Sequence, residues 1–177
     1  INNNTITNIL NKIEVKAGDV VMVKAGTIHA IGAGVFICEI QQNSNCTYRM
    51  YDYDRRDKFG NPRELHVKKA LDVVDNHKYI KDNKTEVVIA RNEHFTEERL
   101  VQCKYFEVYK YDVNDEAKIT VDEASFVSVL FINGSGTIET DDYEKTMEFK
   151  AGDSFFVSAG LRSIIIKGQA TMVVTRV

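Results

Sequence analysis

The sequence predicts an all-β protein with one internal duplication and a short connecting helix. Three observations predict this fold class: a repeated turn-and-strand motif, a series of short apolar runs bounded by turn residues, and a change to helical spacing between them. The chain has 177 residues, of which 44% are apolar and 28% charged, so it can bury the cores that such a fold needs.

The repeat relates residues 15–34, VKAGDVVMVKAGTIHAIGAG, to residues 149–168, FKAGDSFFVSAGLRSIIIKG. Lys-Ala-Gly-Asp and the later Ala-Gly recur at a constant offset, 134 residues from Lys16 to Lys150. Solenoid repeats recur about every 20 to 50 residues. The offset here is longer, so it indicates a duplicated domain. In each copy we expect a Gly-Asp turn to open a strand and an Ala-Gly turn to close it.

Between the two copies the spacing becomes helical. After Pro62, apolar residues follow at three- and four-residue spacings, at Leu65, Val67, Ala70, Leu71, Val73 and Val74. This predicts an amphipathic helix of about 15 residues with the proline near its first turn, followed by an exposed connector over residues 76–86. The rest of the chain contains eight strand-like runs typical of a jelly roll: VVIA, KYFEVYKYDV, KITV, SFVSVLFING, GTIET, DSFFVSAG, SIIIKG and TMVVTRV.

Charge and composition argue against several functions. The net charge of −3 comes from 23 basic and 26 acidic residues that are interspersed, so the sequence predicts no nucleic-acid partner. No apolar run reaches the roughly 20 residues that span a bilayer, and the first residues lack the order of a signal peptide, so no membrane is expected. Three cysteines without a Cys-x-x-Cys pair favour reduced thiols in a cytoplasmic protein.

The first copy carries a candidate metal ligand, His29. The spacing Gly18-x5-Lys24-x-Gly26-x2-His29 resembles the second conserved motif of the cupin superfamily, with lysine in place of the usual proline. A turn at Gly26 would direct His29 into a barrel, where a neutral imidazole can bind a divalent metal; a packed or exposed histidine is the alternative. The second copy has Ser163 at the equivalent position, so the metal site would be confined to the first copy.

Residues 15–75 resemble the type I mannose-6-phosphate isomerases, in particular the short bacterial form. The resemblance rests on the motifs Ala-Gly-Thr-Ile-His-Ala-Ile-Gly-Ala-Gly, Glu-Ile-Gln-Gln, Thr-Tyr-Arg, Tyr-Asp-Tyr-Asp-Arg and Arg-Glu-Leu-His, in this order. From about residue 86 the chain resembles the second cupin domain of the same family more loosely. The resemblance implies a duplicated cupin fold: residues 1–60 as the C-terminal half of the catalytic cupin domain, 61–85 as helix and linker, and 86–177 as a second, non-catalytic cupin domain.

The resemblance also implies roles for single residues. The family binds one zinc ion through a glutamine, a glutamate and two histidines, and His29 matches the later histidine. The motifs for the other ligands do not occur here, so we expect them upstream of Ile1 in a longer parent protein, as the start without Met also suggests. Arg49 matches the catalytic arginine and Glu39 the active-site glutamate ten residues before it. Asn45 stands where an aspartate is usual.

Two further residues are candidates for substrate binding. Tyr48 is one of three tyrosines in residues 48–53, which either line a sugar pocket or pack in a sheet. Arg55 lies in the basic run 55–63, which could attract a phosphate but alternates with aspartates, as a solvated surface does. Glu39 lies in the apolar run 35–40, which predicts a strand core where an acid needs a partner.

These residue types suit the interconversion of an aldose 6-phosphate and a ketose 6-phosphate. The reaction moves a proton between C1 and C2 while negative charge accumulates on the neighbouring oxygens. A metal polarises those oxygens, a carboxylate or histidine carries the proton, and an arginine stabilises the enediolate. We therefore expect the parent to be a cytoplasmic, zinc-dependent mannose-6-phosphate isomerase with a sugar phosphate as substrate, and this chain alone to be inactive.

Two alternatives belong to other functional classes. The chain could be a non-catalytic double-cupin module that binds a sugar phosphate or a partner protein, with His29 as a relic. Another cupin metalloenzyme, such as a dioxygenase or an epimerase, is disfavoured because the chain has no His-x-His motif. The sequence leaves the oligomeric state open.

Overall fold

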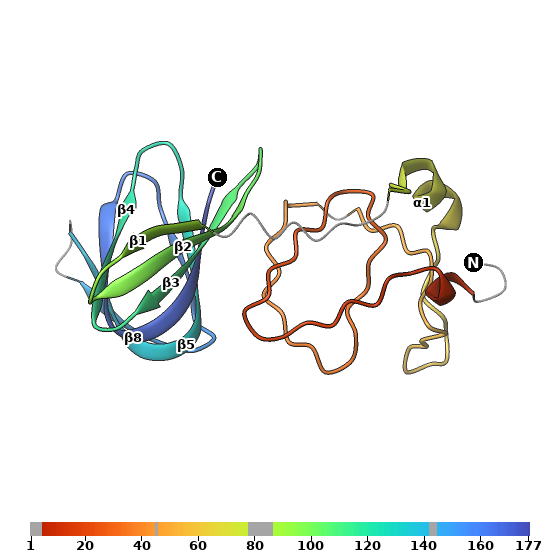
Figure 1. Cartoon of the computed structure of the whole chain (residues 1–177), viewed down its shortest axis with the longest axis horizontal. Helices are drawn as coiled ribbons and strands as arrows, with labels where there is room; N and C mark the ends of the chain where they lie inside the picture. Colours follow the sequence, from red (N-terminus) through yellow and green to blue (C-terminus); the bar gives the residue numbers. More distant parts are fainter. Residues whose placement is uncertain (1–4, 45, 78–86, 142–144) are drawn as a thin grey trace. The chain divides into compact units, whose positions relative to one another are not determined.

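The structure is a computed structural model that describes residues 5–44, 46–77, 87–141 and 145–177. The chain divides into two compact units, Ile1–Lys81 and Asp82–Val177 (Figure 1). The described strands all belong to the second unit, and the described helices to the first. The finer division into residues 1–60, 61–85 and 86–177 stays a prediction, and most of the expected connector, together with Asn45, falls outside the described residues.

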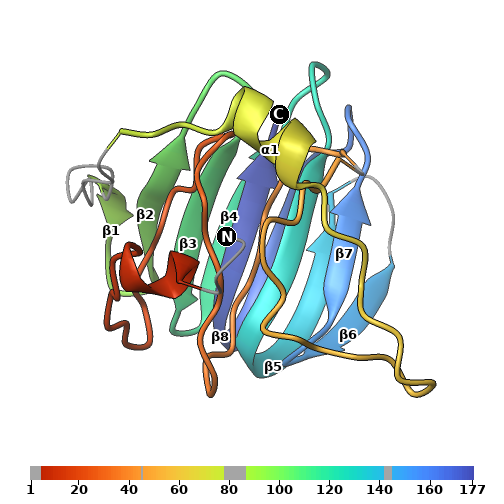
Figure 2. The ribbon, with the colours of Figure 1, turned by 90° about the vertical axis from the view of Figure 1, so that its right-hand side faces the viewer.

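The second unit is an antiparallel sheet that folds around an apolar core. Its strands are β1 Val87–Arg91, β2 Phe95–Gln102, β3 Glu107–Val113, β4 Glu116–Val121, β5 Val127–Thr140, β6 Thr146–Lys150, β7 Ser154–Val157 and β8 Arg162–Arg176. Their order is β1-β2-β3-β8-β5-β6, with β4 also paired to β8 and β7 to β5 (Figure 2). The two long strands β5 and β8 therefore hold the sheet together, since each pairs with three others.

The core of this unit comes from alternate residues of the strands. Strand β4, with the sequence EAKITV, alternates between exposed and buried side chains along its whole length, as expected of a strand with one face on a core. Phe131 is fully buried and stacks on Phe149, with 3.7 Å between the ring centroids. Buried aliphatic side chains and a methionine surround this pair: Ile119, Val129, Ile138, Ile164, Ile166, Met172 and Val174.

Two pairs of predicted runs are in fact single strands. SFVSVLFING and GTIET form β5, and SIIIKG and TMVVTRV form β8. The glycines that suggest turns lie instead where the two strands approach closely: Gly136 pairs with Gly168, and a Cβ at Gly136 would come within 1.9 Å of the Lys167 carbonyl oxygen. The prediction also missed β2, whose charged residues obscure the strand pattern, and the short strand β6.

The first unit contains two short helices, η1 Ile6–Asn8 and α1 Val67–Val73. α1 lies where the sequence predicts a helix, but it has 7 residues and not about 15. It starts later than predicted because Pro62 is engaged in an isolated β-bridge with Arg56. It ends at Val73 because Val74 has an extended backbone.

The Gly-Asp turn of the repeat has the same geometry in both units. The carboxylate of Asp19 accepts a hydrogen bond from the Lys16 N–H at 3.2 Å, and the equivalent bond in the turn 150–153 measures 2.9 Å. Gly18 and Gly152 have φ angles of 91° and 92°, a left-handed conformation that favours glycine. The duplication seen in the sequence is therefore also present in the backbone.

The strands predicted between these turns are absent from the described residues of the first unit, so that prediction is wrong there. In the second unit the equivalent residues form β6, β7 and the start of β8, which all pair with β5. At the offset of 134, the counterpart of β5 falls at or before residue 6. Without a neighbour, strand N–H and C=O groups stay unpaired. Accordingly Val23 is 40% exposed, whereas its counterpart Val157 is 6% exposed.

Candidate functional site

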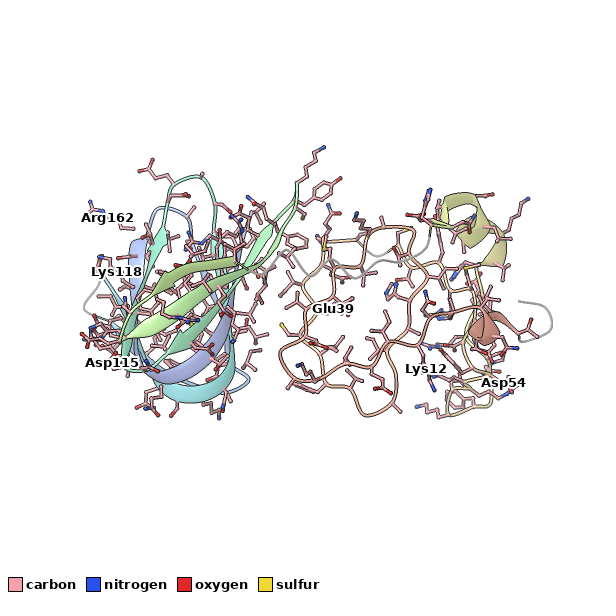
Figure 3. All side chains as sticks on the ribbon, viewed as in Figure 1. Lys12, Glu39, Asp54, Asp115, Lys118 and Arg162 are labelled. Atoms are coloured by element: carbon pink, nitrogen blue, oxygen red, sulfur yellow. The ribbon has the colours of Figure 1, made fainter. Side chains whose placement is uncertain are left out.

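The site residues predicted from the sequence fall in two groups within the first unit: His29 and Glu39 in the first, and Tyr48, Arg49 and Arg55 in the second. No hydrogen bond or ion pair between described residues joins His29 or Glu39 to Arg49. Figure 3 shows Glu39 well separated from Asp54, which neighbours the second group in the sequence. The described part of the first unit therefore brings together only the second group.

His29 is exposed, and the prediction that it points into a barrel is wrong for this structure because the surrounding residues form no strands. Its Nδ1 lies 2.9 Å from the carbonyl oxygen of Thr27. A carbonyl oxygen only accepts hydrogen bonds, so Nδ1 carries a proton, and in the neutral imidazole Nε2 then keeps its lone pair. This tautomer can bind a metal through Nε2.

Glu39 is also exposed, so the prediction of a strand core around it is wrong. The run 35–40 forms no strand, and its apolar side chains Val35, Phe36 and Ile37 are exposed as well. Within the described ranges, no group of three or more His, Cys, Asp and Glu side chains could hold a metal ion. His29 and Glu39 therefore do not form a complete metal centre with other described residues.

Arg49 belongs to a polar cluster with Asp52, Arg63 and His66. Asp52 is 8% exposed and is the only buried charged residue in the part of the chain that the structure describes. Arg63 donates to both oxygens of this carboxylate, from Nε to Oδ2 at 2.7 Å and from Nη2 to Oδ1. The Nε of Arg49 lies 3.8 Å from the same Oδ1. Two guanidinium groups thus share one buried carboxylate.

The electrostatics of this cluster follow from these contacts. The hydrogen bond from Arg63 lowers the pKa of Asp52, and the charges of Arg49 and Arg55 lower it further. The same hydrogen bond raises the pKa of Arg63. At neutral pH the cluster therefore contains two arginine cations, Arg49 and Arg63, and one aspartate anion, and Arg55 adds a third cation beside it. This excess of positive charge suits an anionic ligand.

The Arg49 segment is also fixed to the residues that precede α1. The His66 N–H donates to the Arg49 carbonyl at 2.7 Å, and the Arg49 N–H donates to His66 Nδ1 at 3.3 Å. The Nη1 of Arg49 donates to the Glu64 carbonyl at 3.1 Å. Arg49 is therefore held through its backbone and its guanidinium, while a quarter of its side chain, 25%, remains exposed.

Tyr48 and Arg55 lie beside this cluster. The ring centroid of Tyr48 is 6.2 Å from that of His66, and a hydrogen bond with Cys46 raises the pKa of Tyr48. The guanidinium of Arg55 lies over the Tyr53 ring, 5.4 Å from its centroid. Both predicted binding residues are exposed, so they are open to solvent next to Arg49.

Asp52, Arg63 and His66 were not among the site residues predicted from the sequence. From the sequence, the basic run 55–63 could either attract a phosphate or form a solvated surface. Arg56 pairs in solvent with Asp54 at 2.9 Å, whereas Arg63, with 47% of its side chain exposed, also bonds the buried Asp52. A usable signal was present. Asp52 follows the predicted catalytic arginine by three residues, and Arg63 and His66 begin and end the motif Arg-Glu-Leu-His.

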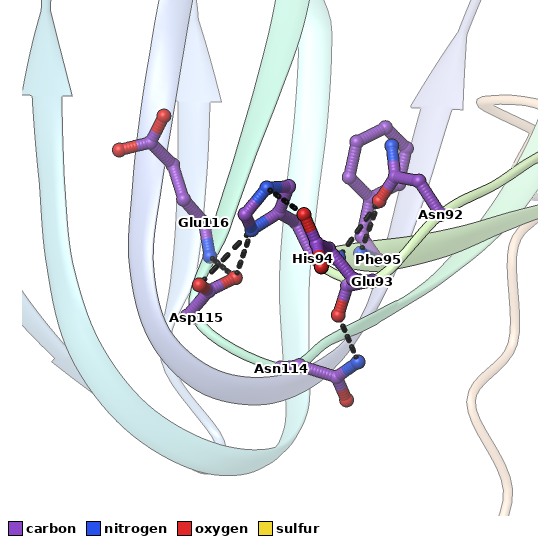
Figure 4. Close-up of polar contacts among 7 residues, drawn as sticks. All are labelled: Asn92, Glu93, His94, Phe95, Asn114, Asp115 and Glu116. Carbon is purple, nitrogen blue, oxygen red and sulfur yellow. Dashed lines mark hydrogen bonds and ion pairs between the residues drawn. The ribbon is translucent and has the colours of Figure 1, made fainter.

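A second polar cluster lies in the second unit, between the β1–β2 turn and the β3–β4 turn (Figure 4). His94 Nδ1 lies 2.9 and 3.0 Å from the two carboxylate oxygens of Asp115, and its Nε2 lies 3.5 Å from the Glu93 carboxylate. The Asn114 N–H donates to the His94 carbonyl at 2.7 Å. The cluster joins the two turns at one end of the sheet.

This contact predicts a pH-dependent contribution to stability. The hydrogen bond and charge of Asp115 raise the pKa of His94. A raised pKa in the folded state stabilises the fold fully below the unfolded value of about 6.5, and this stabilisation is lost as pH rises through the folded pKa. We expect His94→Gln to lower Tm at pH 5.5 more than at pH 8.5, measured by circular dichroism. Equal losses at the two pH values would contradict this prediction.

Comparisons with known proteins identify the family. A family model described as "Mannose-6-phosphate isomerase, cupin domain" matches residues 96–177. The Bacillus subtilis protein YvyI is 41% identical over 182 residues, which cover 100% of this chain and 54% of that protein. Mannose-6-phosphate isomerase ManA of Bacillus subtilis is 34% identical over 177 residues, which cover 94% of this chain and 51% of ManA.

The chain belongs to the mannose-6-phosphate isomerase family. A crystal structure of the mannose 6-phosphate isomerase from Bacillus subtilis is 40% identical, with a TM-score of 0.67 over 77% of this chain and 42% of that one. These matches confirm the predicted all-β, cupin fold. The chain spans about half the length of the curated members of the mannose-6-phosphate isomerase family that it matches. None of its described helices is long and apolar enough to cross a membrane.

Proposed function

We propose that this chain forms part of a cytoplasmic, zinc-dependent mannose-6-phosphate isomerase that interconverts mannose 6-phosphate and fructose 6-phosphate in carbohydrate metabolism. The Arg49 cluster carries the proposal. It holds a partly exposed arginine in a fixed orientation beside two further cations, within a chain whose relatives are named for this reaction. The sugar phosphate is an anion, and its reaction passes through a second, enediolate anion.

Each predicted residue has a separate role in this reaction. Arg49 stabilises the enediolate oxygens, because its charge is permanent and its orientation is set before the substrate binds. Glu39 carries the proton between C1 and C2. Tyr48 and Arg55, exposed beside Arg49, contact the sugar and its phosphate. For Glu39 to act with Arg49, the two must be brought together by protein that lies outside the described residues.

His29 fits a zinc ligand, since its Nδ1 donates to Thr27 and leaves Nε2 free to bind. A protein zinc site typically has about four ligands, counting a water or substrate at a catalytic site, so His29 alone is insufficient. We expect the glutamine, glutamate and second histidine that the family resemblance implies to come from the part of these relatives that the chain does not match. When bound, zinc supplies Lewis-acid polarisation of the sugar oxygens.

A chimera tests this proposal. This chain would replace the matching half of ManA from Bacillus subtilis, and zinc content and fructose 6-phosphate formation would be measured. We expect the chimera to bind stoichiometric zinc and to isomerise mannose 6-phosphate, and the chain alone to do neither. A His29→Ala chimera, the control, should lose zinc.

A folded chimera that binds zinc but has no turnover would contradict the proposal. Isothermal titration of the isolated chain with mannose 6-phosphate adds a second readout. Binding without zinc, combined with an inactive chimera, would favour a non-catalytic module that recognises a sugar phosphate.

A further inference from the structure

Asp52 has no role in the reaction outlined above, although its environment is unusual. It is 8% exposed, and every other charged residue described in the first unit is more exposed. Burying a carboxylate is unfavourable unless cations and hydrogen bonds compensate for the lost hydration. Here the compensation comes from Arg63 and Arg49, which approach the same carboxylate from two separate segments of the chain.

The neighbouring aspartates have local roles that do not involve Arg49. Asp57 accepts hydrogen bonds from two backbone N–H groups, at 2.8 and 2.9 Å, and so closes the turn 57–61. Asp54 pairs with Arg56 in solvent. Asp52, in contrast, connects the segment 49–52 to the segment 63–66.

We propose that Asp52 is a positioning residue for Arg49, and that Arg63 holds Asp52 in place. Arg63 occupies both carboxylate oxygens with its planar fork, which fixes the plane of the carboxylate. The fixed Oδ1 then holds the Nε side of the Arg49 guanidinium, while the Glu64 carbonyl holds Nη1. The proposal rests on the proposed function, in which Arg49 contacts the substrate.

Removing the Asp52 charge should disturb Arg49 more than its neighbours. Asp52→Asn keeps the size of the side chain, but it leaves Arg49 and Arg63 as two cations without the anion between them. Arg49 would then be held through Nη1 only, and its guanidinium could rotate. A displacement of about 1 Å at a reacting centre can cost roughly 100-fold in rate.

The first measurement uses the 177-residue chain itself. We expect Asp52→Asn to shift or broaden the Nε–H signals of Arg49 and Arg63 in proton–nitrogen NMR spectra. The matched control, Arg56→Gln, breaks the exposed pair with Asp54 and should leave both signals unchanged. An Arg49 signal that does not respond to Asp52→Asn would overturn the proposal.

The second measurement uses the chimera. Asp52→Asn should lower kcat about 10- to 100-fold and change KM by less than about threefold. Arg63→Lys keeps the positive charge but not the planar guanidinium, so it should lower kcat by a smaller factor. In an Arg49→Lys background, Asp52→Asn should cost little more. If the kcat losses of the two substitutions multiply in the double variant, or if a smaller folded fraction explains the loss in Asp52→Asn, Asp52 has only a structural role. Either result would overturn the proposal.

Failure of the proposed function would look different. An unsubstituted chimera without activity would count against the isomerase assignment. The NMR comparison in the isolated chain would still decide whether Asp52 orients Arg49, because it needs neither substrate nor zinc.

Discussion

Arg49→Ala in the chimera is expected to lower kcat by at least about 100-fold and to leave the zinc content unchanged. The magnitude is that of removing one pre-oriented group that stabilises a developing oxyanion. Zinc should stay because Arg49 is not among the expected ligands, and no hydrogen bond or ion pair between described residues joins it to His29. Metal analysis and steady-state kinetics on the same preparation would measure both quantities.

Two further variants separate the function of Arg49 from its contribution to the fold. Arg49→Lys keeps the charge but lacks the guanidinium that pairs with Asp52 through Nε and bonds the Glu64 carbonyl through Nη1, so an intermediate loss of kcat is expected. Arg55→Ala removes an exposed cation whose guanidinium lies over Tyr53, and should mainly raise KM for mannose 6-phosphate. Parallel losses of zinc and activity in Arg49→Ala would instead assign Arg49 a structural role.

The repeat shows which parts of the fold the sequence can predict. The Gly-Asp turns depend on residues three positions apart, and both copies form them with nearly equal φ angles at Gly18 and Gly152. A strand depends on a distant partner, so the same residue pattern gives β7 beside β5 in the second unit and no strand in the described first unit. Local sequence therefore predicts turns reliably and strands only where their partners are present.

Glycine limits the prediction of strand boundaries. At Gly136 and Gly168 the residue permits two backbones to approach, whereas at Gly152 it permits a left-handed turn. The sequence shows glycine in both cases, so it does not distinguish a close approach of two strands from a turn. The prediction therefore divided β5 and β8 at glycines that lie inside them.

The site was predicted where a motif identifies a residue, and missed where burial decides its role. The motif Thr-Tyr-Arg predicts Arg49 as a site residue, and in the structure its guanidinium contacts Glu64 and Asp52. Asp52 and Asp54 are two residues apart in an alternating run, yet one is buried and the other lies in solvent. The difference arises from Arg63, eleven residues from Asp52, and no local pattern reveals that contact.

Phe131→Ala should have the largest effect on the stability of the second unit. The side chain is fully buried and stacks on Phe149, and it also meets the edge of Phe155 with 6.0 Å between centroids. Removing such a ring from a close-packed core costs about 3–5 kcal/mol of unfolding free energy. The control, Phe156→Ala, removes a ring that is 69% exposed and should cost about 1 kcal/mol or less. Urea unfolding followed by circular dichroism would measure both.

The same pair of variants tests whether the second unit takes part in catalysis. Apolar side chains fill its described interior around Phe131, so no substrate group is expected to bind there. In the chimera, Phe131→Ala should therefore leave kcat within about twofold at temperatures where the unit stays folded, while inactivation by heat begins earlier. A loss of kcat in fully folded Phe131→Ala, without a similar loss in Phe156→Ala, would mean that the second unit contributes to the reaction and not only to the scaffold.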